Sequence, residues 1–302
     1  MSTFPEATTG TVFKPVIIAR GAVLILLALV LTGCSMLRLA YQQADSLLYW
    51  WIDGYVDLHE SQTVPLRDDI DALLRWHRDS QLPGYVTRLQ QWQVLAQADS
   101  TPEQACQQFE VLRAAYLRLI ERSLEPAARL ALSLSPQQLQ HLQRKYARNN
   151  REFENDFIRV SDEERIDHLL DKALERYEPL YGRLHAAQLR LLREHIRRSG
   201  FDAPRVNAER QRRQADLLHT LRELQADRGT TIATAVVALR HWHDRVMQSP
   251  TPGFAAYSEA LVRNGCEQFA VVHNSATPEQ RAHAVRLLKG YESDFRALLA
   301  PR

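Results

Sequence analysis

The chain has 302 residues, of which 45% are hydrophobic and 25% are charged, and its formal net charge at pH 7 is +2. This composition indicates a folded, water-facing protein with one large core or two smaller ones, and it excludes long disordered or low-complexity tracts. Because 38 basic residues are balanced by 36 acidic ones, the strongly basic surface of a nucleic-acid-binding protein is excluded, and we expect no nucleic-acid partner.

Residues 14–33, KPVIIARGAVLILLALVLTG, place Lys14 and Arg20 ahead of an uncharged apolar run. About a dozen apolar residues are too few for a helix that crosses a bilayer, which needs about 20. The run is typical of a secretory signal peptide, so residues 1–33 are expected to be removed. The run ends in LTGC, which resembles the lipobox of bacterial lipoproteins. This resemblance implies that Cys34 becomes the lipidated first residue of the mature chain; an uncleaved membrane anchor is the alternative.

The residue after the cysteine bears on location. In lipoproteins an aspartate there is associated with retention in the inner membrane, and this chain has Ser35. The resemblance therefore implies attachment to the outer membrane through diacylglycerol and fatty acyl chains such as palmitate, with the body facing the periplasm. Several acyl chains anchor a protein stably, whereas a single chain binds only marginally.

The mature chain, residues 34–302, has the apolar spacing of helices throughout and no convincing strand pattern. Ser or Thr three residues before Gln or Glu forms a capping box, which marks a helix start. This pattern occurs in TPEQ at 101–104, SPQQ at 135–138, SDEE at 161–164 and TPEQ at 277–280. Proline and glycine predict breaks near 81–85, Pro126, 198–204, Gly229 and 249–253.

These signals predict an all-α fold, a multi-helix bundle of about ten helices. Residues 34–302 are expected to form one periplasmic domain, with 200–230 as a candidate sub-boundary.

The first helical segment of the mature chain carries apolar residues on one stripe: Leu37, Tyr41, Ala44, Leu48, Trp51, Tyr55 and Leu58. Trp and Tyr favour the membrane interface, so this helix could lie on lipid headgroups. Against this, the carboxylates of Asp45, Asp53 and Asp57 would be repelled by anionic headgroups. We therefore predict a core helix, with a membrane-surface helix as the alternative.

Two further stripes predict helix packing. Apolar steps of three and four from Ile166 to Leu191 predict one long helix, kinked at Pro179. A shorter stripe from Tyr146 to Val160 has Asn150 on its apolar side. We interpret Asn150 as a buried amide that fixes the register of two helices.

Several motifs occur twice and suggest two related helical halves with solenoid-like packing. Chance recurrence of helix caps is the alternative. A shift of 142 residues superimposes Ser135, Pro136, Gln138, His141, Arg144 and Phe153 on Thr277, Pro278, Gln280, His283, Arg286 and Phe295. With different offsets, CQQF from Cys106 matches CEQF from Cys266, and Trp76–His77 matches Trp242–His243.

Four segments carry a resemblance to a known family: CSMLRLAYQQADSLLYWWIDGYVDL at 34–58, LLRWHRDSQLPGY at 73–85, LSPQQL near Ser135, and NNREFENDF at 149–157. In these segments the chain resembles the uncharacterised bacterial lipoproteins grouped as domain-of-unknown-function family 6279 (DUF6279). The resemblance implies an all-helical, lipid-anchored protein. It implies no activity and no catalytic residue.

The segment NNREFENDF is the strongest candidate for a polar site. We interpret Asn149, Asn150, Arg151, Glu152 and Asp156 as an interaction or structural polar cluster. A desolvated carboxylate there could serve as a general acid or base, but arginines nearby are ready ion-pair partners. Metal-ligand, nucleophile and phosphate-loop motifs do not occur, so we predict no metal, no cofactor and no catalytic residue.

Cys106 and Cys266 are the cysteines that remain once Cys34 is acylated. Because the periplasm is oxidising, we predict a disulfide between them. Two buried free thiols are the alternative.

Taken together, these features predict an outer-membrane lipoprotein with a non-catalytic scaffold or interaction role and a protein partner in the cell envelope. One alternative is a helical periplasmic hydrolase of cell-wall glycan, which would need a carboxylic acid with a raised pKa. Another is a carrier of an apolar ligand, lined by Trp50, Trp51, Trp76 and Trp92. The sequence leaves the partner and the oligomeric state open.

Overall fold

The computed structural model describes residues 36–227 and 229–300. Within them the chain forms twelve α-helices and no strand, so the fold is all-α as predicted. The bounds are α2 (Met36–Gln42), α3 (Ala44–Val56), α4 (Glu60–Ser80), α5 (Leu82–Leu95), α6 (Pro102–Ser133), α7 (Pro136–Phe157), α8 (Asp162–Tyr181), α9 (Ala186–Arg197), α10 (Ala203–Ala226), α11 (Ile232–Met247), α12 (Phe254–Asn274) and α13 (Pro278–Leu299). The predicted signal peptide and Cys34 lie outside the described residues.

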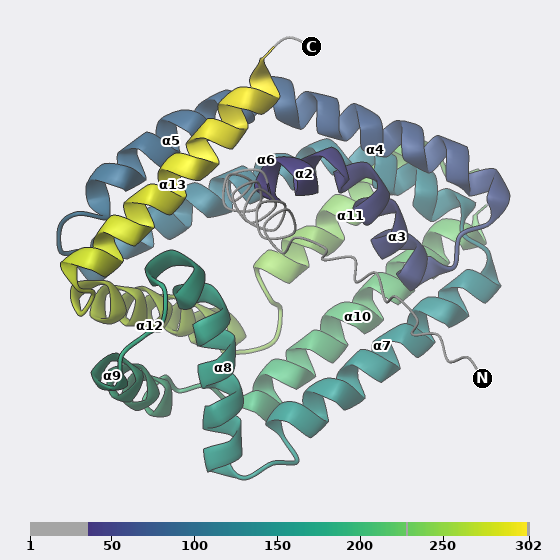
Figure 1. Cartoon of the computed structure of the whole chain (residues 1–302). Coiled ribbons are helices and arrows are strands. Elements are labelled where there is room, and N and C mark those ends of the chain that lie inside the picture. Colours follow the sequence, from purple (N-terminus) through teal and green to yellow (C-terminus); the bar gives the residue numbers. More distant parts are fainter. Residues whose placement is uncertain (1–35, 228, 301–302) are drawn as a thin grey trace, which may run out of the picture.

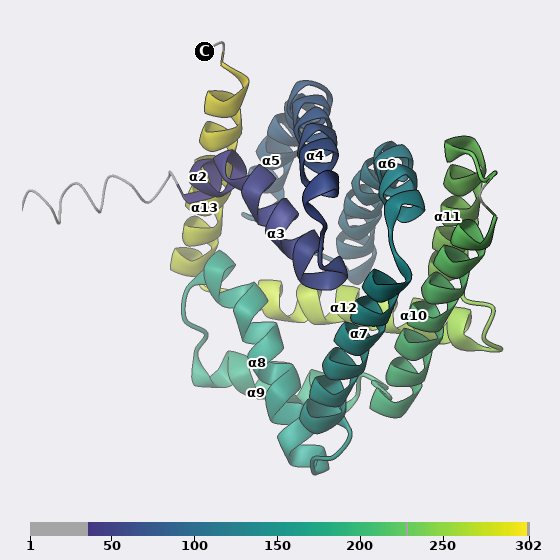
Figure 2. The same ribbon diagram turned by 90° about the vertical axis from the view of Figure 1, so that its right-hand side faces the viewer.

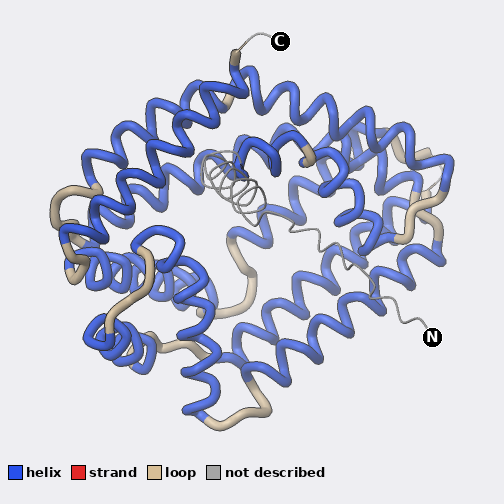
Figure 3. The backbone as a smooth tube through the Cα atoms, viewed as in Figure 1, coloured by secondary structure: helices blue, strands red, loops and turns tan. Residues whose placement is uncertain are grey.

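The helices are arranged around a ring (Figure 1). Helix α13 lies along α5, and α10 lies along α7, so segments far apart in the chain become neighbours. In the turned view α12 runs across the direction of α5, α6 and α11 (Figure 2). Short loops join most helices (Figure 3). None of the described helices is both long enough and apolar enough to cross a membrane.

Three clusters of buried apolar side chains hold the ring together. The largest joins α3, α6, α7, α10 and α11, and includes Leu139, Leu221 and Leu239. A second joins α8, α9, α12 and α13 around Leu192 and Val272. A small third cluster packs α3 on α4. Burial of these side chains is the main stabilising contribution.

The four predicted capping boxes are confirmed. Thr101, Ser135, Ser161 and Thr277 each precede a helix, and each hydroxyl accepts the N–H of the residue three positions on. The Gln or Glu at that position accepts the N–H of the capping residue in return. Both orphan donors at the helix start are therefore satisfied.

Two predictions about proline are wrong. Helix α6 continues through Pro126, because Leu124 and Ala128 on either side are buried in the core and their packing offsets the lost backbone hydrogen bond. The stripe from Ile166 to Leu191 is two helices rather than one kinked helix. The break lies at Gly182, whose φ of 72° is in the region that glycine favours, and not at Pro179.

A pair of buried glutamines occurs twice. Gln138 Nε2 donates to Gln62 Oε1 over 2.8 Å, with the return contact at 3.3 Å. Gln188 Nε2 donates to Gln280 Oε1 over 2.7 Å, with the return contact at 3.2 Å. We call Gln62 and Gln138 the first glutamine pair, and Gln188 and Gln280 the second. Each glutamine lies in the first turn of its helix, at the start of α4, α7, α9 and α13 respectively.

The two pairs also make equivalent bonds to the backbone. Each glutamine accepts the N–H of the residue immediately before its own helix. It also donates to the backbone carbonyl oxygen that lies three residues before the first residue of the partner helix. The acceptors are the carbonyl oxygens of Ser133 and Asp57 for the first pair, and of Ser275 and Arg183 for the second. The capping donors are the N–H groups of His59, Ser135, His185 and Thr277. This repeated geometry supports an internal duplication, divided between α7 and α8.

The duplication extends beyond the shift of 142 residues. Residues 55–70, YVDLHESQTVPLRDDI, match residues 181–196, YGRLHAAQLRLLREHI, at a shift of 126. Two of the recurrences used to suggest the repeat are not equivalent positions. Cys106 lies near the start of α6 whereas Cys266 lies in the second half of α12, and the Trp–His pairs lie on α4 and α11. Helix α4 corresponds instead to α9, through Gln62 and Gln188.

Candidate functional site

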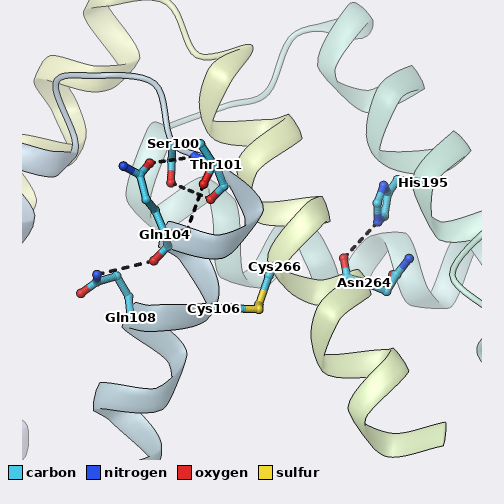
Figure 4. The surroundings of a disulfide bond; sticks show 8 residues. All are labelled: Ser100, Thr101, Gln104, Cys106, Gln108, His195, Asn264 and Cys266. Carbon is cyan, nitrogen blue, oxygen red and sulfur yellow. Dashed lines mark hydrogen bonds between the residues drawn. A yellow bond between two sulfur atoms is a disulfide. The ribbon is translucent and has the colours of Figure 1, made fainter. Parts of the chain in front are cut away.

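A disulfide joins Cys106 of α6 to Cys266 of α12 (Figure 4). Their Cα atoms are 5.3 Å apart, although the residues are separated by 160 positions in sequence. The capping box of Thr101 and Gln104 sets the start of α6 one turn before Cys106. On the other side, His195 of α9 bonds the carbonyl oxygen of Asn264 over 3.1 Å. The disulfide therefore joins the two halves between helices whose positions are already set by other contacts.

The predicted polar cluster on α7 is divided by the helix into two faces. Asn150 exchanges two amide hydrogen bonds with Gln214 of α10, at 2.7 and 3.1 Å. Asn149 donates to the hydroxyl of Tyr55 over 3.2 Å. These contacts support the interpretation of Asn150 as an amide that fixes helix register, although Asn150 is partly buried rather than buried as predicted. The structure does not bring these residues together with the other three members.

Arg151, Glu152 and Asp156 are exposed to solvent. Glu154, between them, is partly buried, and its carboxylate pairs with Arg159 over 2.9 Å. A general acid with a raised pKa needs a desolvated, unpaired carboxyl group, and none of these residues has that environment. The arrangement on α7 is therefore that of a helix–helix contact with a solvated outer face.

Two buried carboxyl groups lie elsewhere. Burial of Glu209 would raise its pKa, but hydrogen bonds from Arg212, Arg213 and Thr251 outweigh it and hold the pKa at about 2. Burial raises the pKa of Asp294 on α13, and the charge of Arg38 opposes that shift. Within residues 36–227 and 229–300, no group of three or more His, Cys, Asp or Glu side chains could hold a metal ion.

A surface hollow of about 770 Å³ lies at the start of α13. Its lining includes Asp99, Arg281 and Arg286, and Asp99 pairs with Arg281. Asp294 is not among its lining residues, so the hollow does not end in the buried carboxyl group that a glycan hydrolase would require. The hydrolase alternative gains no geometric support from it.

The tryptophans proposed to line a carrier pocket do not converge. Trp50 and Trp51 are exposed on α3, and neither lines the hollow. Trp92 on α5 donates its indole N–H to Gln108 over 2.9 Å. Trp76 on α4 is covered by the guanidinium of Arg122. Each tryptophan therefore has a separate local role.

A buried series of hydrogen bonds joins α8 and α12 of the second half to the segment between α5 and α6 of the first. The hydroxyl of Tyr181 bonds His273 Nδ1 over 2.7 Å, and His273 Nε2 bonds the carbonyl oxygen of Ala98 over 2.7 Å. Because a carbonyl only accepts, Nε2 carries the proton and Nδ1 accepts from Tyr181. Burial lowers the pKa of His273 and raises that of Tyr181, so both side chains are neutral. No motif in the sequence indicates these hydrogen bonds.

Among the exposed apolar side chains of the described residues, two groups stand out. Leu47, Trp50 and Trp51 form the first, which we call the α3 patch; their exposed fractions are 59%, 63% and 64%. Phe109, Leu112 and Tyr116 form the second, the α6 row, with 41%, 55% and 43% exposed. The predicted core stripe is therefore wrong at Trp51, because α3 turns Tyr49 and Val56 into the protein instead.

Comparison with known proteins gives a family. No curated protein and no solved structure matches the chain. The model of a family of unknown function, DUF6279, matches residues 54–238, which is more than half of the chain. The chain therefore belongs to the DUF6279 family.

Proposed function

We propose that this chain is a lipoprotein of the bacterial outer membrane, anchored through Cys34, whose helical body is a non-catalytic scaffold for a protein partner in the periplasm. The LTGC sequence supports the lipid anchor. The disulfide between Cys106 and Cys266 supports an oxidising compartment, because such bonds are rare in proteins kept in a reducing cytosol.

The α6 row is the observation that carries the scaffold role. Its residues recur at steps of three and four and share one face of the helix. Exposed aromatic and large aliphatic side chains on a fixed helix are typical anchors of protein interfaces. The Glu110–Arg113 ion pair lies beside the row and gives it a polar edge.

The disulfide and the packing of α6 against α11 and α12 hold this face in place before a partner binds. Less conformational entropy is then lost on binding, which favours affinity for a given contact area. A rigid, pre-formed helix face suits a scaffold.

A photo-crosslinking amino acid at position 112 of the full-length chain, in its native envelope, tests the scaffold role. We expect a discrete crosslinked protein from position 112 and none from the matched control at Leu191, an equally apolar exposed position on α9. Equal crosslinking from both positions, or none from position 112, would contradict the proposal. Purified peptidoglycan should stay intact, and soluble glycan release abolished by Glu152→Gln or Glu154→Gln would establish the hydrolase instead.

The lipid anchor has a separate test. Cys34→Ser removes the sulfur that would carry diacylglycerol, so we expect an uncleaved, unacylated precursor. Intact-mass measurement on both proteins decides the point, and identical processing of the two would rule out lipidation at Cys34.

A further inference from the structure

We propose that the α3 patch rests on the surface of the bilayer to which Cys34 is anchored, and so orients the helical ring on the membrane. This inference rests on the proposed lipid anchor. Three observations carry it: the shape of the exposed face, its distance from Cys34 along the chain, and the positions of its charges.

The patch belongs to an apolar face that extends through α2. The N–H of Gln43 donates to Leu39 and the N–H of Leu47 donates to Gln43, at 3.1 and 3.0 Å, so the helical bonding continues from α2 into α3. Leu39, Gln43, Leu47 and Trp51 therefore follow one another at steps of four along α2 and α3, across the turn at Gln43. All four side chains are exposed, and none is charged.

The face lies close to the proposed lipid. Helix α2 begins at Met36, two residues after Cys34. Two residues of extended chain span about 7 Å, and a helix rises about 1.5 Å per residue. Trp51 is therefore within about 30 Å of the anchored cysteine along this path. A helix that leaves the anchor in the plane of the membrane keeps the whole face at the headgroups.

The carboxylates of Asp45 and Asp53 do not lie on the exposed face that carries Leu47 and Trp51. Asp45 lies four residues before Tyr49, on the face that α3 buries. Asp53 accepts the N–H of Leu58 over 2.8 Å at the end of the helix. Electrostatic repulsion from Asp45 therefore acts away from the exposed face, whereas Asp57, beyond the end of α3, is 77% exposed and lies 3.9 Å from His141 Nδ1.

Tryptophan suits this position because its ring is apolar and its N–H remains free to bond headgroups or water. The opposite face of α3 is held on α4, where the hydroxyl of Tyr49 bonds Thr63 over 3.1 Å. Contact between the patch and the bilayer would therefore set the orientation of the ring rather than that of a loose helix.

Fluorescence of the full, mature chain in vesicles tests the contact. The vesicles contain phosphatidylethanolamine and phosphatidylglycerol whose acyl chains carry bromine, a short-range quencher of tryptophan. The chain has five tryptophans, of which two lie in the patch. We expect bromine to quench the parent protein and a Trp92→Phe control alike, and to have no effect on the Trp50→Phe, Trp51→Phe double variant.

Quenching that persists in the double variant would overturn the proposal. Absence of quenching in the parent, with iodide in the water reaching Trp50 and Trp51 equally with and without vesicles, would also overturn it and leave the patch to a protein partner. The intact mass of the same sample reports acylation. An unacylated chain held by its uncleaved N-terminus and still quenched through Trp50 and Trp51 would remove the lipid anchor while retaining the contact.

Discussion

The two glutamine pairs have the same hydrogen-bonding geometry in different surroundings. Tyr55 and Tyr181 occupy equivalent positions just before the helices that carry Gln62 and Gln188. In the first half the hydroxyl of Tyr55 accepts from Asn149, whereas in the second the hydroxyl of Tyr181 bonds His273.

The difference arises at one position of the repeat. At the shift of 142 residues, the counterpart of His273 is Ala131 on α6. Ala131 is buried in the largest apolar cluster, so the first half has a dry contact where the second has a hydrogen-bonded histidine. A half-satisfied buried polar group is costly, whereas an apolar contact can be exchanged freely if its volume is kept. The glutamine geometry is therefore the fixed element of each half, and its surroundings vary.

Removing the disulfide between the halves is expected to have the largest effect on stability. Replacing both Cys106 and Cys266 by serine opens a loop of 160 residues, which in the chain-entropy model lowers the free energy of unfolding by about 4 to 5 kcal/mol. Urea unfolding with and without reductant measures this. The serine variant is the control, because reductant should not change it. A parent protein with an unchanged midpoint after reduction, or with two alkylatable thiols before it, would show that the bond does not form.

Single glutamine substitutions are expected to have the next largest effect, and to be alike in the two halves. Gln138→Leu and Gln280→Leu each leave the capping N–H of their own helix and one backbone carbonyl oxygen without their glutamine partner, which lowers the free energy of unfolding by about 2 to 4 kcal/mol. The Gln62→Leu, Gln138→Leu double variant should lose less than the sum of its singles, since either single already removes the bonds between the two glutamines. Additive losses in urea unfolding would mean that the paired amides do not act as a unit.

Substitutions of the equivalent tyrosines, Tyr55 and Tyr181, are expected to lower the stability by different amounts. Tyr181→Phe leaves His273 Nδ1 buried without a donor and lowers the free energy of unfolding by about 1 to 3 kcal/mol. Tyr55→Phe should cost less than about 1 kcal/mol, because Asn149 is partly exposed and can bond water instead. Equal losses for the two variants would argue against the assigned difference.

The smallest effect is the pH dependence that His273 contributes. Burial lowers the pKa of His273 below its ordinary 6.5, with Arg281 adding to the shift and the bond to Ala98 opposing it. The unfolded chain therefore takes up this proton at a higher pH than the folded one. Stability falls as the pH falls through 6.5 towards the folded pKa, by at most about 1.4 kcal/mol per pH unit for one group.

His273→Gln retains a donor for Ala98 and an acceptor for Tyr181 without a titrating ring. It should flatten the plot of unfolding free energy against pH below 6.5. His77 on α4, whose pKa burial also lowers, keeps its own contribution and provides a comparison. An unchanged slope in His273→Gln would assign the dependence to other groups.

Much of the fold could be predicted because helix signals are local. Apolar spacing and the four capping boxes depend on residues three or four apart, and they located the starts of α6, α7, α8 and α13. The starts of α4 and α9 were not predicted from capping boxes, because histidine is not a usual residue at the capping position. Gln62 and Gln188 nevertheless follow it at the same spacing. The predicted helix break at Pro126 was wrong because the packing around this residue depends on segments that are distant in the sequence.

The candidate site could be predicted only where one residue type has one dominant environment. Two remaining cysteines pointed to one another, and Asn150 on an apolar stripe pointed to another helix. The environment of Trp51 could not be predicted in this way. Helix α3 has large apolar residues on two faces, and only the neighbouring helices decide which face is covered. The distant partners of Gln62, Tyr181 and His273 lie 71 to 175 residues away, beyond any spacing rule.

The disulfide makes residues 106–266 a closed covalent loop with two tails. Gln138 and Gln188 lie inside this loop, and Gln62 and Gln280 lie in the tails. Each tail is therefore clamped to the loop by one glutamine pair. A protease that nicks the chain once within the loop would leave two fragments still joined through sulfur, each with one tail clamped in place. A body exposed to envelope proteases would thus retain its connectivity after a single cut.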